Sequence, residues 1–511
     1  MIFSSLQYLI FLPIVVFLYW RTTGGVRLAL VVLASYFFYM SWLPAYGLLL
    51  FALTCANWLL GLAIERSRTA GSRYSQVFLV LGLILNLGCL CYYKYTNFFL
   101  SNIAACLSWM RGNAGYAGSF IPAWDAPVLK VLLPLGISFF VFEFVHYLVD
   151  VYKGDKPVRS WMEFAAFASF FPSQIAGPIK RYQDFLHRLR QPERWTGPLF
   201  YEGMALVMQG LFKKVAIADP IGAIVYTGFT CSHTLSSADA LVASIGFVIQ
   251  VYCDFSGYTD IGRGSALLIG IRLPENFQLP YLSHDLADFW RRWHMSLSYW
   301  LRDYVYIPLG GSRGNRWINW RNLFLTMVAC GLWHGAAWHY VIFGSMQGIG
   351  LIVNREWKNL LSAVSPLGAV CNTWFGKQLG TFLTMSFITV SYTVFRAPDM
   401  AHARYVLSGL FNVGSQCTLW EPILKSAVLQ FLSVYTGFWL LTSALKAISS
   451  SPGQSAAGQH PGLGSRRLPS FIWDHRVGYS PPVKLAAWTA ALILMVAAKP
   501  TEATPFVYFQ F

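Results

Sequence analysis

Two histidines, one in an apolar run and one in a basic, aromatic segment, are the residues best suited to do chemistry. His334 lies in the segment Gly-Leu-Trp-His-Gly of a long apolar stretch, and His294 lies in a segment rich in tryptophan and arginine. An imidazole can take and return a proton near neutral pH, and an ionisable residue inside an apolar span is a functional-site hypothesis by default. We therefore expect His334 to act as a base, and the structural alternative is a neutral histidine bonded to a neighbouring helix.

The residues around His294 have side chains that suit a ligand bearing phosphates and a ring. If this segment is one helix, Trp290, Trp293 and His294 share one face of it. Arg291 and Arg292 then lie on other faces. Arginine binds phosphate, and tryptophan stacks on a ring or packs along an acyl chain, which would suit coenzyme A. The alternative is an interfacial aromatic belt whose arginines reach toward water.

Other polar residues are harder to assign. Asp254 and Asp260 lie in the apolar stretch 252–260, where they could line a polar pathway or belong to a satisfied structural network. Metal binding is not expected, because the sequence has no HExxH segment and no paired-cysteine spacing. His334 and His339 are five residues apart, so they do not share a helix face.

Composition indicates the class of protein whose fold positions these residues. The chain has 511 residues, of which 56% are apolar and 12% are charged. The charged fraction is about half that of a soluble domain, which excludes a soluble multidomain protein and also a disordered one. A protein with many membrane spans remains. The net charge of +16 falls in short loops between apolar runs, which is typical of the positive-inside rule rather than of a nucleic-acid partner.

Apolar runs of membrane-spanning length predict about eleven transmembrane helices. The runs cover residues 2–20, 28–42, 45–64, 76–99, 128–151, 201–226, 238–267, 322–353, 379–394, 427–445 and 482–497. Basic residues alternate along the early loops, being concentrated at 21–27, 65–75 and 152–160. This alternation places those three loops in the cytoplasm and the N-terminus outside.

Two regions depart from simple spans. Residues 161–179 are apolar but carry Pro172 and Gly177, which predicts a re-entrant or partly embedded helix. Residues 272–321 are too polar to face lipid and too aromatic for a solvated loop, so we expect them to line a funnel or cavity. We divide the chain into a membrane core at 1–400 and a C-terminal part at 401–511, whose Ser/Gly/Pro-rich segment 449–470 reads as a flexible loop.

The combination of these motifs resembles the membrane-bound O-acyltransferase (MBOAT) family. The resemblance rests on residues 290–304 and 332–335. Supporting matches lie at 1–5, 133–139, 176–178, 254–258 and 275–277. It extends from residue 1 to about residue 400, and the motifs are most similar to those of the bacterial alginate O-acetylation branch, which has cellulose-acetylating and teichoic-acid D-alanylating relatives.

This resemblance implies an all-α polytopic membrane protein in which about eleven transmembrane helices, with re-entrant or embedded helices, surround a central funnel. It implies that His334 is the catalytic histidine and His294 a second, supporting one. The implied activity is acetyl transfer from a cytoplasmic thioester, acetyl-CoA, across the bacterial inner membrane. The acetyl group would serve O-acetylation of an exported polysaccharide such as alginate or cellulose, through periplasmic acetyltransferase partner proteins.

Alternative functions stay open on the sequence alone. The acyl group could be D-alanine for teichoic acid, or the acceptor could be a lipid or protein hydroxyl. Two histidines in a polar funnel would also suit a transporter with no acyl chemistry, or the chain could be a scaffold for periplasmic enzymes. Within the acyltransferase reading, His334 either activates the acceptor hydroxyl or is itself transiently acylated.

Overall fold

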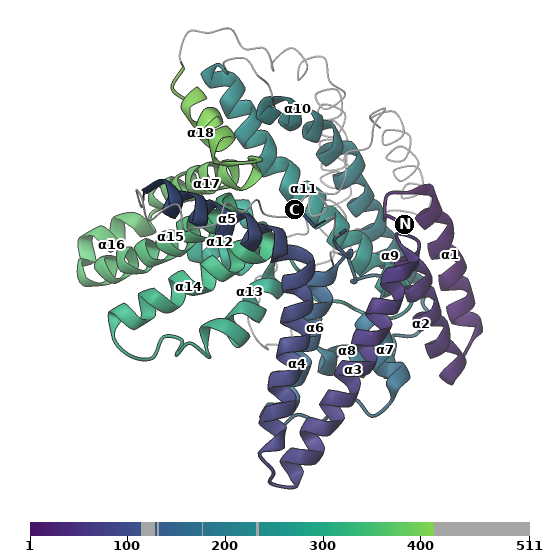
Figure 1. Cartoon of the computed structure of the whole chain (residues 1–511). Helices are drawn as coiled ribbons and strands as arrows, with labels where there is room; N and C mark the ends of the chain where they lie inside the picture. The colour runs from purple at the N-terminus through teal and green to yellow at the C-terminus, as the bar shows by residue number, and fades with distance from the viewer. Residues whose placement is uncertain (114–127, 130–131, 176, 231–234, 413–511) are drawn as a thin grey trace, which may run out of the picture.

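The computed structural model describes residues 1–113, 128–129, 132–175, 177–230 and 235–412, and every regular element in those ranges is helical, as predicted (Figure 1). The α-helices are α1 (Leu6–Arg21), α2 (Gly24–Met40), α3 (Pro44–Thr69), α4 (Tyr74–Leu90), α5 (Thr96–Asn113), α6 (Ile137–Lys153), α7 (Trp161–Ser169), α8 (Tyr182–Arg190), α9 (Gly197–Leu211), α10 (Asp219–Thr230), α11 (Ser237–Leu268), α12 (Leu286–Arg292), α13 (Met295–Leu301), α14 (Arg316–His334), α15 (Trp338–Ala363), α16 (Ser365–Asn372), α17 (Trp374–Arg396) and α18 (Met400–Gly409). Shorter π and 3₁₀ turns are η1 (Cys91–Tyr95), η3 (Phe212–Ala218), η4 (Pro280–Leu282) and η5 (Arg302–Tyr306).

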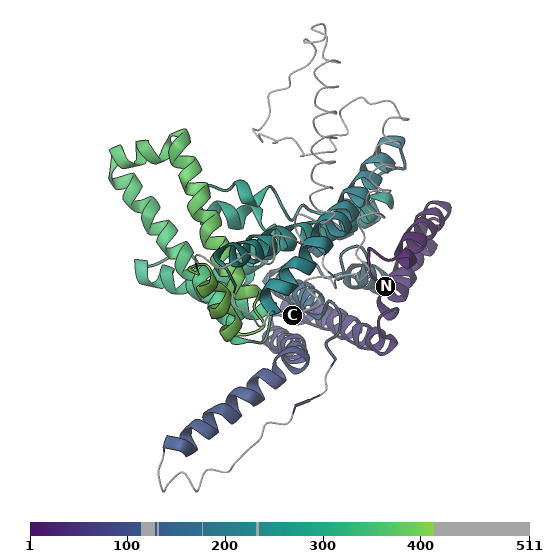
Figure 2. The same ribbon diagram turned by 90° about the horizontal axis from the view of Figure 1, so that it is seen from above.

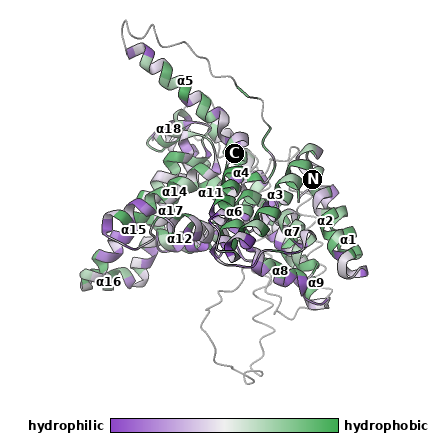
Figure 3. Cartoon of the chain, turned by 60° about the horizontal axis from the view of Figure 1, so that its bottom comes forward, coloured by the Kyte–Doolittle hydropathy of each residue, from purple (hydrophilic) through white to green (hydrophobic). Residues whose placement is uncertain are grey.

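The apolar helices have the character of membrane spans. Three stretches, Pro44–Thr69, Tyr74–Asn113 and Ser237–Leu268, are long and apolar enough to cross a bilayer, and α1 and α2 are shorter apolar helices. Large apolar side chains on the outer helices are exposed, as Leu33 (69%) and Leu48 (73%) illustrate, and Figure 3 shows hydrophobic residues along most helices. Exposed apolar surface on this scale indicates a multi-pass membrane protein. The predicted spans at 427–445 and 482–497, and the predicted loop at 449–470, lie outside the described residues.

Two of the three basic loops lie together at one end of the helical bundle. Arg159 forms an ion pair with Glu65 at 2.6 Å, and an Arg68 guanidinium nitrogen donates to the Gly154 carbonyl at 3.2 Å. We call this end, defined by residues 65–75 and 152–160, the basic end. Helix α3 runs about 39 Å from it to the opposite end, where the N-terminal amine donates to Ser41 at 2.5 Å.

Two predicted spans differ from the helices observed. The run 322–353 is not one span but parts of two helices, because α14 ends at His334 and α15 starts at Trp338. The run 128–151 is helical only from Ile137 onward. Proline disfavours a helical conformation in the residue before it, and Pro134 precedes α6 closely.

Glycines allow the inner helices to approach closely. Helix α11 runs through the middle of the bundle and packs against α9, α10 and α17 (Figure 1). A Cβ atom at Gly210 on α9 would lie 2.4 Å from the Gly257 carbonyl on α11, and one at Gly264 would lie 2.5 Å from the Gly203 carbonyl. Small residues at such contacts are typical of membrane helices. Helix α5 extends away from this bundle as a single helix (Figure 2).

Candidate active site

His334 is the last residue of α14 and is almost fully buried, with 7% of its surface exposed. Its Nε2 atom lies 4.0 Å from the thiol of Cys330, one turn earlier on the same helix. The chain leaves the helix in an extended conformation at Gly335, where a Cβ atom would lie 2.0 Å from the Tyr340 ring. Glycine is therefore required directly after His334, which explains the Trp-His-Gly order in the sequence.

His294 is fully buried and lies at a break between two helices. Helix α12 ends at Arg292, Trp293 is extended, and His294 has a left-handed backbone with φ of 43°. The segment is therefore not one helix, so Trp290, Trp293 and His294 do not share a helix face. The break arises because Asn276 accepts from the Met295 N–H (3.0 Å) and the Ser296 N–H (3.0 Å), so another segment satisfies the donors at the start of α13.

The His294 side chain has features of a functional residue. Neither ring nitrogen has a hydrogen-bond partner within the described part of the chain, and buried polar groups are nearly always paired. A non-glycine residue in the left-handed region is also uncommon, and such residues cluster at functional sites. His294 thus keeps hydrogen-bonding capacity that the described residues do not use.

The Trp333 indole connects the two histidines. Its ring centroid lies 4.9 Å from that of His334 and 5.9 Å from that of His294, both in edge-on orientations. Phe142 stacks on the other side of Trp333 at 5.3 Å and on Trp300 at 3.8 Å. The fold therefore brings together the two histidines that the sequence places forty residues apart, within one aromatic cluster.

Two cavities adjoin His334. The smaller, of about 170 Å³, is lined by His334, Trp333 and Ser138 among others. The larger, of about 750 Å³, is lined by Gly335, the next residue, and also by Arg396. Imidazole atoms at the wall of a cavity can reach a substrate hydroxyl, so the geometry suits a base.

The cavities lie away from the basic end. Helix α14 starts close to η5. In η5, the Tyr304 hydroxyl donates to Asp150 at 2.7 Å, and Asp150 is three residues before Lys153 in the basic end. From there α14 runs about 28 Å to His334. Trp42, between α2 and α3 at the opposite end, lines the smaller cavity.

The residues expected to bind the donor lie apart from His334. Arg291 and Arg292 both pair with Asp288, at 3.3 and 2.9 Å, and the Arg291 side chain is 64% exposed. Trp290 is buried and donates to Gln347 at 3.1 Å. Trp293 is buried against neighbouring aromatic rings. None of the four predicted residues is among the described residues that line the two cavities.

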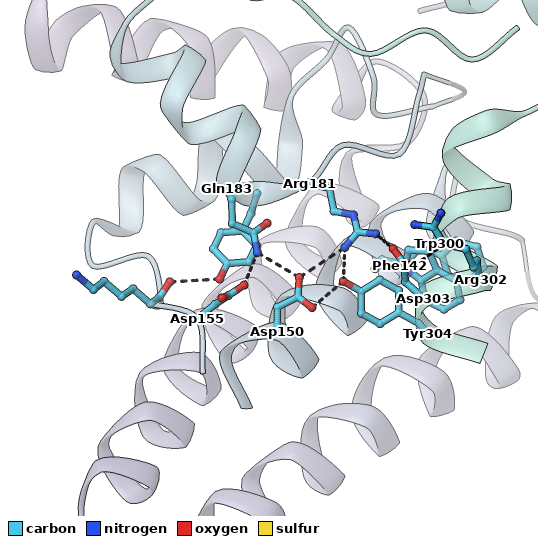
Figure 4. Close-up of polar contacts among 11 residues, drawn as sticks. Phe142, Asp150, Asp155, Arg181, Gln183, Trp300, Arg302, Asp303 and Tyr304 are labelled. Atoms are coloured by element: carbon cyan, nitrogen blue, oxygen red, sulfur yellow. Dashed lines mark hydrogen bonds and ion pairs between the residues drawn. The ribbon is translucent and has the colours of Figure 1, made fainter. Parts of the chain in front are cut away.

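A polar cluster at the basic end includes Arg181, which sequence reasoning did not single out (Figure 4). Arg181 forms an ion pair with Asp303 and donates to Tyr304 at 2.7 Å. Burial acts to raise the pKa of the Asp303 carboxyl, but hydrogen bonds from Arg302 and Arg181 outweigh burial and hold that pKa below its ordinary value. The ring of Tyr304 packs on Trp300, so this cluster adjoins the aromatic residues beside His334.

Lys94 is the second residue that sequence reasoning missed. It lies in the predicted span 76–99, and its Nζ donates to the carbonyls of Trp333 at 2.6 Å and His334 at 2.9 Å. A lysine inside an apolar run is itself a signal of function, and it could have been noticed on that ground.

The stretch 252–260 belongs to a buried ionic network. Lys214 pairs with Asp219 at 2.7 Å and with Asp254 at 2.9 Å. Lys213 pairs with Asp260 at 2.6 Å. Of the two alternatives for this stretch, the contacts favour a satisfied structural network, because each carboxylate has a lysine partner from η3.

Comparison with known proteins agrees with this picture. A family model described as "MBOAT, membrane-bound O-acyltransferase family" matches residues 99–395. A probable alginate O-acetylase of Pseudomonas syringae pv. tomato is 34% identical over the whole of both chains. A peptidoglycan O-acetyltransferase of Helicobacter pylori is 34% identical over 75% of this chain and 73% of its own. A teichoic acid D-alanyltransferase of Streptococcus thermophilus is 28% identical over 51% of this chain and 68% of its own.

Proposed function

This chain belongs to the membrane-bound O-acyltransferase family, and we propose that it moves an acetyl group from acetyl-CoA, on the cytoplasmic side of a bacterial inner membrane, for O-acetylation of an exported polysaccharide such as alginate. Similarity to an alginate O-acetylase over the full length of both chains supports the donor group and the acceptor class. The observation that carries the proposal is the placement of His334, which is buried at a helix end, lines a cavity and adjoins the same indole as a second buried histidine.

The proposed chemistry is general-base acyl transfer. A neutral His334 takes the proton of the acceptor hydroxyl while the hydroxyl oxygen attacks the carbonyl carbon of the thioester. The carbon–sulfur bond then breaks, the proton passes from the imidazolium to the sulfur, and an ester and a free thiol leave. The alternative, transient acylation of His334, would use the same residue as nucleophile.

His294 is proposed to support this step. The tetrahedral intermediate carries an oxyanion, which needs a preorganised hydrogen-bond donor. A buried imidazole whose ring nitrogens have no hydrogen-bond partner among the described residues can supply such a donor without first breaking another bond. Its contact with Trp333, the residue before His334, places it on the same aromatic cluster as the base.

The donor and the acceptor are proposed to approach from opposite ends. We assign the basic end to the cytoplasm because basic loops face it, and we assign acetyl-CoA to that side. Arg291, with most of its side chain exposed, and its neighbour Arg292 are proposed to bind the CoA phosphates. The cavity of about 750 Å³ at the opposite end is proposed to admit the acceptor hydroxyl of a periplasmic acetyltransferase partner, which then esterifies the polysaccharide.

A second acceptor has specific support. The peptidoglycan O-acetyltransferase of Helicobacter pylori is as identical to this chain as the alginate O-acetylase is, although over three quarters of it rather than the whole. Peptidoglycan, also an exported polymer with sugar hydroxyls, is therefore the runner-up acceptor. D-alanyl transfer has weaker support, since that relative is less identical and matches about half of the chain.

The proposal can be tested with inside-out membrane vesicles from the host cell, which expose the cytoplasmic face to added donor. Labelled acetyl-CoA is expected to give ester-linked label that mild base releases, and His334→Ala vesicles are expected to give none. Digestion with a polysaccharide lyase or a muramidase then distinguishes alginate from peptidoglycan. Label that enters only from a D-alanyl thioester would overturn the acetyl proposal.

A further inference from the structure

Lys94 lies in an unusual place for a basic residue. It belongs to η1, a five-residue π-helical turn that joins α4 to α5 within the apolar stretch Tyr74–Asn113. Turns of this type are rare and are frequent at functional sites. The side chain contacts the far end of a helix some 240 residues later in the chain, through its bonds to the Trp333 and His334 carbonyls at 2.6 and 2.9 Å.

These hydrogen bonds satisfy carbonyl groups at the end of the helix that carries His334. The last carbonyls of an α-helix have no N–H partner within the helix. In α14, three of these carbonyls accept hydrogen bonds from η1. Tyr95 donates to the Leu332 carbonyl at 2.6 Å, and Lys94 donates to the carbonyls of Trp333 and His334. In an apolar environment an unpaired carbonyl is costly, so η1 is a cap for α14 supplied from another span.

The location of Lys94 links this cap to the reaction. Lys94 lines both cavities, the smaller one that His334 lines and the larger one that Gly335 lines. The peptide groups that it holds are those on either side of the His334 α-carbon. A shift of these groups would therefore move the imidazole relative to both cavities.

We propose that Lys94 is a positioning residue, which holds the end of α14 so that the His334 imidazole faces the acyl group in the geometry needed for transfer. This inference rests on the proposed role of His334. Misplacement of a reacting group by about 1 Å costs on the order of 100-fold in rate, so loss of the cap should lower kcat rather than weaken donor binding.

The test uses the full chain purified in a lipid bilayer, with acetyl-CoA as donor, and compares Lys94→Met with Lys94→Arg. Lys94→Met removes the donor at similar length, whereas Lys94→Arg keeps side-chain N–H donors. Lys94→Met is expected to lower kcat at least 10-fold while KM for acetyl-CoA stays within twofold, and Lys94→Arg is expected to recover much of kcat. Lys377→Met, at an exposed position on α17, is the matched control and should behave as the native chain.

Two results would overturn the inference. One is a Lys94→Met protein whose kcat is within twofold of native. The other is a Lys94→Met protein whose thermal midpoint falls steeply while the folded fraction keeps full activity, because Lys94 would then be structural only. His334→Ala in the same assay distinguishes a failure of the Lys94 proposal from a failure of the proposed function. Activity in His334→Ala would refute the role of His334, whereas an inactive His334→Ala beside a fully active Lys94→Met would refute the role of Lys94 alone.

Discussion

Replacing Gly331 by alanine should separate the two helices that form the site. Gly331 lies on α14 one turn before His334, where α14 and α15 cross at backbone contact. An added Cβ atom would lie 2.2 Å from the Tyr340 carbonyl oxygen and 2.9 Å from the Gly344 α-carbon. Both contacts are with backbone, so no side-chain rotation can relieve them.

The magnitude follows from these distances. An ordinary carbon–oxygen contact is about 3.3 Å, so α15 must move by about 1 Å at this point. Overpacking of this kind costs about 1–3 kcal/mol, and a 1 Å displacement of a reacting group costs on the order of 100-fold in rate. Gly331→Ala should therefore lose nearly all acyl transfer while part of the protein stays folded in the membrane.

The assay is donor-dependent acyl transfer at matched membrane levels, together with the thermal midpoint of the purified protein. Gly88→Ala is the matched control, because Gly88 lies on the apolar helix α4 and a Cβ atom there would have no neighbour within 4 Å. Gly88→Ala should retain activity and stability. Native rates in Gly331→Ala would refute the argument that this contact sets the position of His334.

Three further changes test other parts of the structure. Asn276→Ala removes the side-chain oxygen that accepts from the Ser296 N–H and hydroxyl, while the backbone carbonyl that accepts from the Met295 N–H stays. It should lower stability by about 1–2 kcal/mol, measured by thermal unfolding, with a larger loss of transfer, and unchanged stability would contradict the capping role. Lys214→Met leaves two buried carboxylates, Asp219 and Asp254, without this partner and should lower stability by about 3–5 kcal/mol, seen as loss of folded protein in detergent. Folded protein at native levels would show that the network is dispensable. Replacing both Arg291 and Arg292 by Gln should raise KM for acetyl-CoA with little change in kcat, and an unaltered KM would refute their role in donor binding.

Much of the helical architecture could be predicted from the sequence, because apolar runs are local signals. The runs at 45–64 and 238–267 coincide closely with α3 and α11. The run 322–353 was harder, since both helices of the hairpin are apolar and the connection between them is only three residues long. Apolar composition alone does not separate two packed helices from one long helix.

The two histidines of the candidate site could be predicted from the sequence, whereas the contacts that hold them in place could not. His334 and His294 each stand out as ionisable residues in apolar surroundings, and the fold places both against Trp333. The left-handed backbone at His294 depends on Asn276, eighteen residues earlier, and could not be read from local helix periodicity. The contact between Lys94 and the end of α14 joins distant segments, which no local pattern specifies.

The central claim is that this chain performs acyl transfer through His334. The most direct measurement is ester-linked acetyl on the exported polysaccharide of cells that carry the native chain, His334→Ala, His187→Ala or no chain, at matched membrane levels. His187 lies on α8 with an exposed side chain, so its replacement controls for loss of an imidazole elsewhere. Acetyl is expected at native levels with His187→Ala and should be absent with His334→Ala. Full acetylation with His334→Ala, where cells lacking the chain have none, would contradict the claim.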